Sequence, residues 1–291
     1  MLSALKSLGH DTVGLSRTSG LDLTDFKSVR RQLSNILPDA VINLAAHVGS
    51  VHYGMRHSAD ILHDNMLMTL NLYRGIAEIC PRARIVNPIS NCSYPGESDV
   101  QREEEWWAGL VHFSALPYGS SRRMTFVAAM CYQQQYGICS KNFVLPGVYG
   151  PGDHADTERV HALDGIIIRM IKAKRQGARE FEIWGSGSPV REWCYVDDIV
   201  EVLIRGLTLE EDLTYPINIG QRKGYSIRES AEMIAGALGY KGKLVFNTSY
   251  PDGDSIKVLD DKRFRKLFPD FVFCDMKKGI QKAVEYYESV L

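Results

Sequence analysis

The sequence lacks several features that would point to particular classes of protein. Its 291 residues contain no apolar run near the roughly 18 residues of a membrane-spanning helix. Net charge is also low, −1 at pH 7 with a pI near 6.7, so nothing attracts nucleic acid or an anionic membrane surface. Internal repeats and metal-site histidine spacings are absent too. We therefore expect no nucleic acid, membrane or metal as a partner.

Cysteine pairing motifs and a secretory signal are missing as well. The six cysteines are Cys80, Cys92, Cys131, Cys139, Cys194 and Cys274. None forms a C-x-x-C pair, so we expect free thiols in a reducing compartment and a cytoplasmic protein. Cys92 differs from the other five, because it lies in a polar loop beside Ser90.

Apolar residues are plentiful, at 45% of the chain with 24% charged, which is enough for a large core. Their periodicity alternates between the strand and helix patterns. Strands are predicted at 12–15, 40–44, 85–89 and 141–145, and helices at 1–8, 24–37, 65–79 and 118–136. This alternation predicts an α/β fold with a parallel, doubly wound sheet.

Ser90, Tyr118 and Arg122 form the most informative set. Ser90 ends a short apolar strand, where open α/β sheets place their ligands. Tyr118 and Arg122 open a helix about thirty residues later, and their i, i+4 spacing puts them on one face. A tyrosine can donate a proton to a substrate carbonyl, a serine can hold the same oxygen, and a nearby cation favours the phenolate. The layout is that of nicotinamide-dependent carbonyl chemistry, so we expect a reductase or epimerase.

Four stretches carry a family resemblance over about residues 5–287. They are Leu44–Gly49 (LAAHVG), Ser90–Pro95 (SNCSYP), Trp184–Glu192 (WGSGSPVRE), and Pro251–Gly253 followed by Lys257–Asp260 (PDG and KVLD). In these the chain resembles the extended short-chain dehydrogenase/reductase superfamily and, within it, the GDP-L-fucose synthases. The resemblance implies a Rossmann-type domain at 1–150 and a smaller, mainly substrate-binding domain at 151–291, with about 195–220 returning to the first.

The family begins with a strand and a Gly-x-x-Gly-x-x-Gly turn that holds the cofactor pyrophosphate. This sequence has neither, and no later glycine-rich segment replaces them. Either residue 1 lies inside the first helix of a longer native protein, or the protein lacks its first strand. We expect the first, because an internal sheet strand is costly to omit.

Remaining cofactor contacts point to NADP(H). Arg17 follows the second expected strand, where a basic residue can pair with the 2′-phosphate of NADP. By resemblance, Asp22 and Leu23 would lie at the adenine, Leu44, Ala45 and Ala46 at the adenosine-pyrophosphate side, and Tyr118 and Arg122 at the nicotinamide ribose. The family has lysine where this chain has Arg122, and arginine is a planar fork of longer reach.

For the substrate, the resemblance places Cys92 and His161 on either side of a sugar ring as the acid/base pair of a double epimerisation. A 4-keto group acidifies the hydrogens at C3 and C5, and a thiol and an imidazole suit proton transfer near neutral pH. Arg169, Arg191 and Lys257 match positions that hold the nucleotide diphosphate, a task for which arginine is suited. Trp184 would shape the same pocket.

The expected function is NADPH-dependent 3,5-epimerisation and 4-reduction of a GDP-4-keto-6-deoxy sugar. Two alternatives stay open. Arg122 and the changed loop at Asn91 could narrow the reaction to C4 reduction or a single epimerisation of a related GDP-sugar, whereas the missing glycine turn favours a cofactor-free pseudoenzyme or assembly partner. The family pairs through two long helices, here 65–79 and 118–136, so a homodimer is expected.

Overall fold

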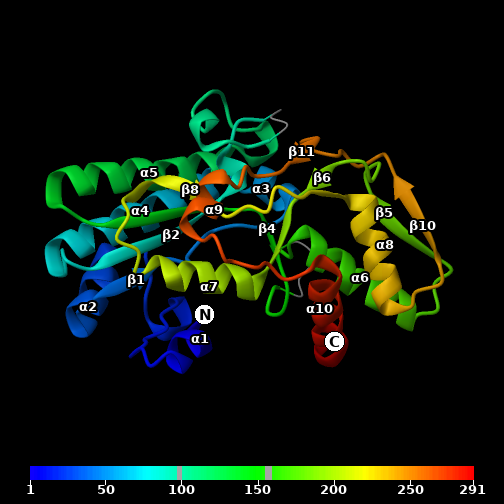
Figure 1. The fold of residues 1–291 in the computed structure, drawn as a ribbon, viewed down its shortest axis with the longest axis horizontal. Coiled ribbons are helices and arrows are strands. Elements are labelled where there is room, and N and C mark those ends of the chain that lie inside the picture. The colour runs from blue at the N-terminus through cyan, green and yellow to red at the C-terminus, as the bar shows by residue number, and fades with distance from the viewer. Residues whose placement is uncertain (97–99, 155–158) are drawn as a thin grey trace.

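The computed structural model describes residues 1–96, 100–154 and 159–291. Its larger lobe contains a parallel sheet with the strand order β1-β2-β3-β8 (Figure 1). These strands are β1 (Ala40–Ile42), β2 (Arg84–Ser90), β3 (Ser140–Leu145) and β8 (Leu213–Asn218). All three pairings are parallel, so every connection crosses over the sheet. The expected Rossmann-type α/β fold is confirmed.

Helices cover both faces of this sheet. Packed on one face are α2 (Phe26–Ile36), α4 (Ser58–Ile79) and α5 (Leu116–Tyr136); on the other are α7 (Val196–Gly206) and α9 (Lys262–Leu267). Figure 1 shows α4 and α5 on one side of the strands and α7 on the other. Strand β2 supplies both cores, because successive side chains point to opposite faces: Ile85 packs with α2 and α4, and Val86 with α7.

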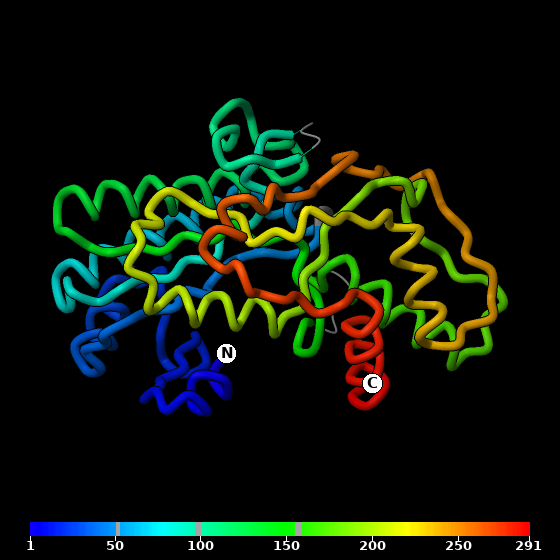
Figure 2. The backbone as a smooth tube through the Cα atoms, in the orientation of Figure 1, coloured from blue at the N-terminus to red at the C-terminus, as the bar shows by residue number. Residues whose placement is uncertain are grey.

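A smaller lobe surrounds a second core. Its main elements are β5 (Glu180–Trp184), β10 (Lys243–Asn247), α6 (Ala162–Arg175), α8 (Ile227–Leu238) and α10 (Met276–Val290). Figure 2 shows the chain leaving this lobe after β5, running through α7 and β8 in the larger lobe, and returning to α8. These two cores support a proposed division near residue 150, with about 195–220 returning to the first domain.

Short elements complete the fold. They are α1 (Leu2–Ser7), α3 (Val51–Arg56), β4 (Gly147–Tyr149), β6 (Val190–Arg191), β7 (Trp193–Tyr195), β9 (Tyr225–Ser226), β11 (Ile256–Lys257) and the 3-10 turns η1 (Arg17–Ser19), η2 (Asn91–Ser93), η3 (Glu103–Glu105) and η4 (Phe113–Ala115). Strand β4 pairs with β7, and β6 lies between β11 and β9. No helix in the described part of the chain is long and apolar enough to cross a membrane.

One expected strand is wrong. Residues 12–15 form no strand, and Gly14 instead lies against the side chain of Leu2 in α1. A strand is stable only when a neighbour takes up its backbone hydrogen bonds, and β1 is the last paired strand at this edge in the described sheet. Residues 12–15 pair with neither β1 nor any other strand of the described sheet, so their backbone lacks the hydrogen bonds that a strand needs.

Candidate active site

Ser90 and Cys92 are fixed at the carboxyl end of β2. The Ser90 Oγ accepts a hydrogen bond from the Cys92 N–H at 3.2 Å and so caps the turn η2. Ser93 Oγ donates to the Ser90 carbonyl at 2.7 Å, which closes the same turn. Parallel sheets present ligand-binding side chains at this edge, so both residues lie where the sequence predicts a site.

Helix α5 begins directly beside this turn. A Cβ at position 119 would collide with the Cys92 carbonyl oxygen, so only glycine permits the approach. Pro117 lies in the first turn of α5, where its missing N–H has no helical partner to lose. The contact brings Tyr118 next to Cys92, and the Arg122 guanidinium carbon lies 5.2 Å from the centre of the Tyr118 ring. The expected pairing of Tyr118 with Arg122 is confirmed.

The ionisation of Tyr118 is governed by two opposed effects. Burial of the phenol raises its pKa above the ordinary value of 10.0, and the nearby Cys92 adds slightly to this. The Arg122 charge lowers the pKa of Tyr118, as expected from the sequence, but burial outweighs it. At neutral pH Tyr118 is therefore a phenol, which is the form that can donate a proton.

Arg122 is hydrogen-bonded to Asn65, a residue to which the sequence analysis assigns no role. Arg122 is 3% exposed, and its Nη2 donates to Asn65 Oδ1 at 2.6 Å. The Asn65 amide also donates to the carbonyls of His47 and Ile61 and accepts from the His47 N–H, so it joins α4 to the segment after β1. Arg122 Nε is buried and has no hydrogen-bond partner among the described residues.

Cys92 is also contacted from the side of the smaller lobe. Lys257 Nζ lies 3.8 Å from the Cys92 sulfur and 2.8 Å from Asp254 Oδ2. Burial acts to lower the pKa of Lys257, but Cys92 and the Asp254 carboxylate together outweigh it, so the pKa of Lys257 is raised. Lys257 is therefore a protonated ammonium group at neutral pH, and it lies beside the Cys92 thiol.

Arg191 reaches the same place because β6 and β11 are paired. Their parallel register sets Arg191 opposite Lys257, and Arg191 Nη2 lies 3.5 Å from the Asp252 carbonyl. Burial lowers the pKa of Arg191, while Asp254, Cys92 and Asp252 act in the opposite direction. Two cations thus stand on adjacent strands beside Cys92, which is an arrangement able to hold a diphosphate.

Trp184 and Arg169 form a separate group. The Arg169 guanidinium carbon lies 4.4 Å from the Trp184 ring centre, and its Nη1 donates to the Glu182 carbonyl at 3.2 Å. Burial lowers the pKa of Arg169. Trp184 stacks on Tyr250 with ring centres 5.0 Å apart and remains 45% exposed. An exposed aromatic plane backed by a cation can accept a flat ligand.

His161 contacts Asp153, and among the described residues no hydrogen bond or ion pair joins it to Cys92. It precedes α6, and both its backbone N–H and its Nδ1 approach Asp153 Oδ2, at 2.8 and 3.0 Å. The hydrogen bond to Asp153 raises the pKa of His161, while burial acts against the shift. Its imidazole side chain is 55% exposed. The two residues of the expected acid/base pair therefore belong to separate contact groups.

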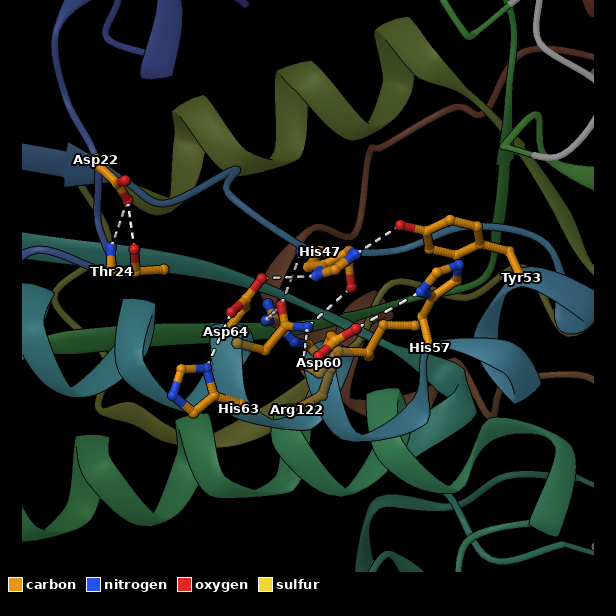
Figure 3. A network of polar contacts seen from close by, with 11 residues as sticks. Asp22, Thr24, His47, Tyr53, His57, Asp60, His63, Asp64 and Arg122 are labelled. Carbon is orange, nitrogen blue, oxygen red and sulfur yellow. Dashed lines mark hydrogen bonds and ion pairs between the residues drawn. The ribbon is translucent and has the colours of Figure 1, made fainter.

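The expected adenosine contacts are distributed between two segments. Asp22 Oδ1 accepts from the Thr24 N–H and hydroxyl at 2.9 and 2.7 Å (Figure 3), and these bonds lower its pKa while burial opposes them. Leu23 packs partly into the core between α2 and α4. Arg17 lies in the exposed turn η1, and Leu44, Ala45 and Ala46 come one residue after the end of β1.

A nicotinamide cofactor fits part of this arrangement. The buried, unpartnered Nε of Arg122 is a donor available to a ribose hydroxyl beside Tyr118. Leu44 is 53% exposed and is followed by two alanines, whose small side chains allow a cofactor to approach the backbone. The sequence provides no glycine turn for the pyrophosphate, so the fit covers the nicotinamide ribose and the adenosine side only.

Beside Asn65 lies a polar network that the sequence analysis missed. His47 Nδ1 is 2.8 Å from Asp64 Oδ2, His47 Nε2 is 2.9 Å from the Tyr53 hydroxyl, and His63 Nδ1 is 3.1 Å from Asp64 Oδ1 (Figure 3). The hydrogen bond from His63 lowers the pKa of Asp64 most, against burial, and His47 adds to the effect. Within the described ranges, no three His, Cys, Asp or Glu side chains are arranged to hold a metal ion.

Known proteins share both the sequence and the fold. A family model for the NAD dependent epimerase/dehydratase family matches residues 1–220. The chain is 28% identical over 281 residues to a GDP-L-fucose synthase of Dictyostelium discoideum, covering 96% of this chain and 87% of that protein. The resemblance inferred from the four sequence stretches is therefore confirmed.

Two solved structures show the same fold. A GDP-L-fucose synthetase from Naegleria fowleri bound to NADP superposes with a TM-score of 0.87 at 23% identity, covering 99% of this chain and 89% of that one. A GDP-mannoheptose C4 reductase from Campylobacter jejuni with NADP bound gives 0.86 at 24% identity, with 99% and 93% covered. The chain thus belongs to the NAD dependent epimerase/dehydratase family, a family of enzymes built on this Rossmann-type fold.

Proposed function

We propose that the protein epimerises a GDP-linked 4-keto-6-deoxy sugar at C3 and C5 and then reduces C4 with NADPH. The observation that carries this proposal is the meeting of Ser90, Cys92 and Tyr118 at the carboxyl edge of the sheet, with Lys257 reaching Cys92 from the smaller lobe. A group that can protonate a carbonyl oxygen, Tyr118, therefore lies beside a group that can remove a proton from carbon, Cys92. Reduction of a keto sugar needs the first group, and its epimerisation needs the second.

Each side chain has a distinct task in this proposal. Tyr118, a phenol at neutral pH, donates a proton to the C4 oxygen, and Ser90 holds the same oxygen. Cys92 removes a proton from carbon. Lys257 and Arg191 bind the diphosphate, with Arg169 and Trp184 further out at the nucleotide. A bound NADPH supplies hydride; Arg122 would hold its ribose and Arg17 its 2′-phosphate, in line with the NADP-bound relative.

His161 would act as the proton donor opposite Cys92. Its hydrogen bond to Asp153 raises the pKa of His161, so the protonated imidazole persists to higher pH than in a free histidine. A charged imidazolium held by a carboxylate is a suitable acid. For this role the ring must face the sugar from the side opposite Cys92.

A second candidate function is reduction at C4 alone. His161 is paired with Asp153 and more than half exposed, whereas Cys92 is paired with Lys257. If the two residues do not reach one sugar ring, epimerisation stops while Tyr118 and Ser90 still serve the carbonyl. The Campylobacter jejuni neighbour is named as a C4 reductase.

One experiment separates the two candidates. The purified protein is incubated with GDP-4-keto-6-deoxymannose in deuterated water, first without and then with NADPH. Deuterium at C3 and C5 without NADPH, followed by formation of a 4-hydroxy product with NADPH, supports the full reaction. Reduction without prior deuterium uptake supports the C4 reductase. If the protein shows neither deuterium uptake nor reduction, and calorimetry detects no binding of NADPH, both candidate functions are contradicted.

We further propose a cytoplasmic homodimer. All six cysteines are free thiols in the structure, as suits a reducing compartment. Helices α4 and α5 lie side by side and expose apolar side chains, among them Leu62, Leu70, Val127 and Met130. Two such helix pairs from two copies would cover these side chains as a four-helix bundle.

A further inference from the structure

Asp254 lies between His112, whose side chain is one-third exposed, and the Lys257 ammonium beside Cys92. Its side chain is 7% exposed, its Oδ2 is 2.8 Å from Lys257 Nζ, and its Oδ1 is 3.4 Å from His112 Nε2. Oδ1 has no hydrogen-bond partner among the described residues. A buried carboxylate is costly unless opposite charges face it, so both oxygens are constrained by their neighbours.

His112 faces this carboxylate through its Nε2, which lies 3.4 Å from Asp254 Oδ1 without a hydrogen bond between the two atoms. Its Nδ1 accepts from the Ser114 N–H at 3.3 Å and lies 2.7 Å from the Ser114 hydroxyl. The neutral ring therefore carries its proton on Nε2, the nitrogen that faces Asp254. Ser114 belongs to η4, which directly precedes α5, so the histidine is anchored next to the helix that carries Tyr118.

Lys257 would otherwise be free to leave the thiol. A lysine side chain is flexible and reaches many positions, and a single contact of 3.8 Å to sulfur is a weak restraint. Arg191, on the neighbouring strand, also repels Lys257. The short ion pair to Asp254 is the contact that fixes the ammonium beside Cys92.

We propose that Asp254, supported by His112, is a positioning residue that holds the Lys257 ammonium against Cys92 and keeps this thiol reactive. An ammonium beside a thiol favours the thiolate, which removes protons and reacts with electrophiles. The role of this thiol in sugar epimerisation rests on the proposed function. The positioning itself is a property of the folded chain and is measurable without substrate.

The test is the rate at which iodoacetamide alkylates Cys92 at pH 7.5, followed by mass spectrometry of the Cys92 peptide. Asp254→Asn, which keeps the shape of the side chain, and Lys257→Met should each slow alkylation about three- to tenfold. The double variant should be no slower than Lys257→Met alone, because both changes remove the same contact. Cys80, which is half-buried at the end of α4, is the internal control. Its alkylation rate reports the reagent concentration and any unfolding of the variants.

The direction of the Asp254→Asn effect decides the matter. Removing a negative charge that does not position Lys257 would by itself favour the thiolate, so an unchanged or faster rate overturns the proposal. An unchanged rate in Lys257→Met overturns it too, and remains informative if Asp254→Asn does not fold. Asp261→Asn is the matched control, since this nearby carboxylate pairs with Arg265 and its loss should leave Cys92 alkylation unaltered. Deuterium uptake by the sugar, measured separately, reports on the proposed function.

Discussion

Tyr118 illustrates at the residue scale how burial and a neighbouring charge compete. Arg122 lies close to the ring but is itself committed to Asn65, and burial of the phenol raises the pKa of Tyr118 more than Arg122 lowers it. The side chain is therefore tuned as an acid that stays protonated at neutral pH. Reduction that depends on this proton should persist through neutral pH and fall only above about pH 10.

Tyr118→Phe should separate reduction from epimerisation. Removing the hydroxyl takes away the proton donor for the C4 oxygen, so the rate of NADPH oxidation with the keto sugar should fall about 10²- to 10⁴-fold. Deuterium uptake at C3 and C5 should continue, because Cys92 is untouched. Loss of both activities to the same extent would show that Tyr118 is not specific to reduction; the exposed Tyr136→Phe is the control.

Some residue-scale contacts could be predicted from the sequence and others could not. Tyr118 and Arg122 are four positions apart on one helix, so their pairing follows from helix geometry. Asn65 and Asp254 contact residues far away in the chain, and only the tertiary fold brings them together. The distance from His161 to Cys92 likewise depends on how the two lobes meet, which periodicity does not encode.

At the scale of elements, the site depends on the close approach of α5 to the turn η2. Gly119 makes this contact possible, since any side chain there would meet the backbone of Cys92. Backbone atoms cannot rotate away as side chains can, so the two elements are locked at a fixed distance. This backbone contact therefore fixes the position of Ser90 relative to Tyr118.

Gly119→Ala should damage the site even though alanine favours helices. The added methyl group must displace η2 from α5, and we expect a loss of about 1–3 kcal/mol in the free energy of unfolding, measured with urea. Gly236→Ala in α8 is the matched control, because no atom lies within 4 Å of a Cβ there and the change should stabilise by about 1 kcal/mol. Equal effects of the two changes would contradict the contact.

Most element positions agree with the periodicity of the sequence, and the exceptions have physical causes. The sequence correctly predicts α2, α5, β2 and β3 to within a few residues. Helix α4 begins at Ser58, well before the expected start at residue 65, because polar residues there lie on its exposed side. The segment 12–15 is apolar enough for a strand but has no pairing partner, and pairing is a tertiary property.

For the whole molecule, two buried carboxyl groups make stability depend on pH. Burial raises the pKa of Asp164 and of Glu192 to about 7, against ordinary values of 3.8 and 4.5. Between pH 5 and 7 the folded chain keeps protons that the unfolded chain has lost. The free energy of unfolding therefore falls as pH rises across this window, by up to about 1.4 kcal/mol per pH unit for each group.

Asp164→Asn should flatten this dependence. Asparagine has no ionisable carboxyl group. Urea unfolding at pH 5, 6 and 7 should therefore show a smaller decline in the free energy of unfolding for the variant than for the unmodified protein. Exposed Asp39→Asn is the control and should leave the slope as it is. A slope that Asp164→Asn leaves unchanged would contradict a buried, protonated Asp164.

Assembly can be tested on the same scale. A glutamate at Leu70 or Met130, which are 44% and 46% exposed on α4 and α5, would place charge at the centre of the proposed bundle. Sedimentation of Leu70→Glu and Met130→Glu should show a monomer where the unmodified protein is a dimer. The same change at Val272, 86% exposed and outside these helices, should leave the mass unaltered.

The parallel sheet also sets an order of events during synthesis. Strand β3 ends at Leu145, and its partner β8 begins only at Leu213. Translation proceeds at roughly 5–20 residues per second, so the far edge of β3 waits several seconds for its neighbour to leave the ribosome. During that time its backbone N–H and C=O groups are open to other nascent chains. A chaperone that covers this edge in the interval between the two strands would prevent such pairing.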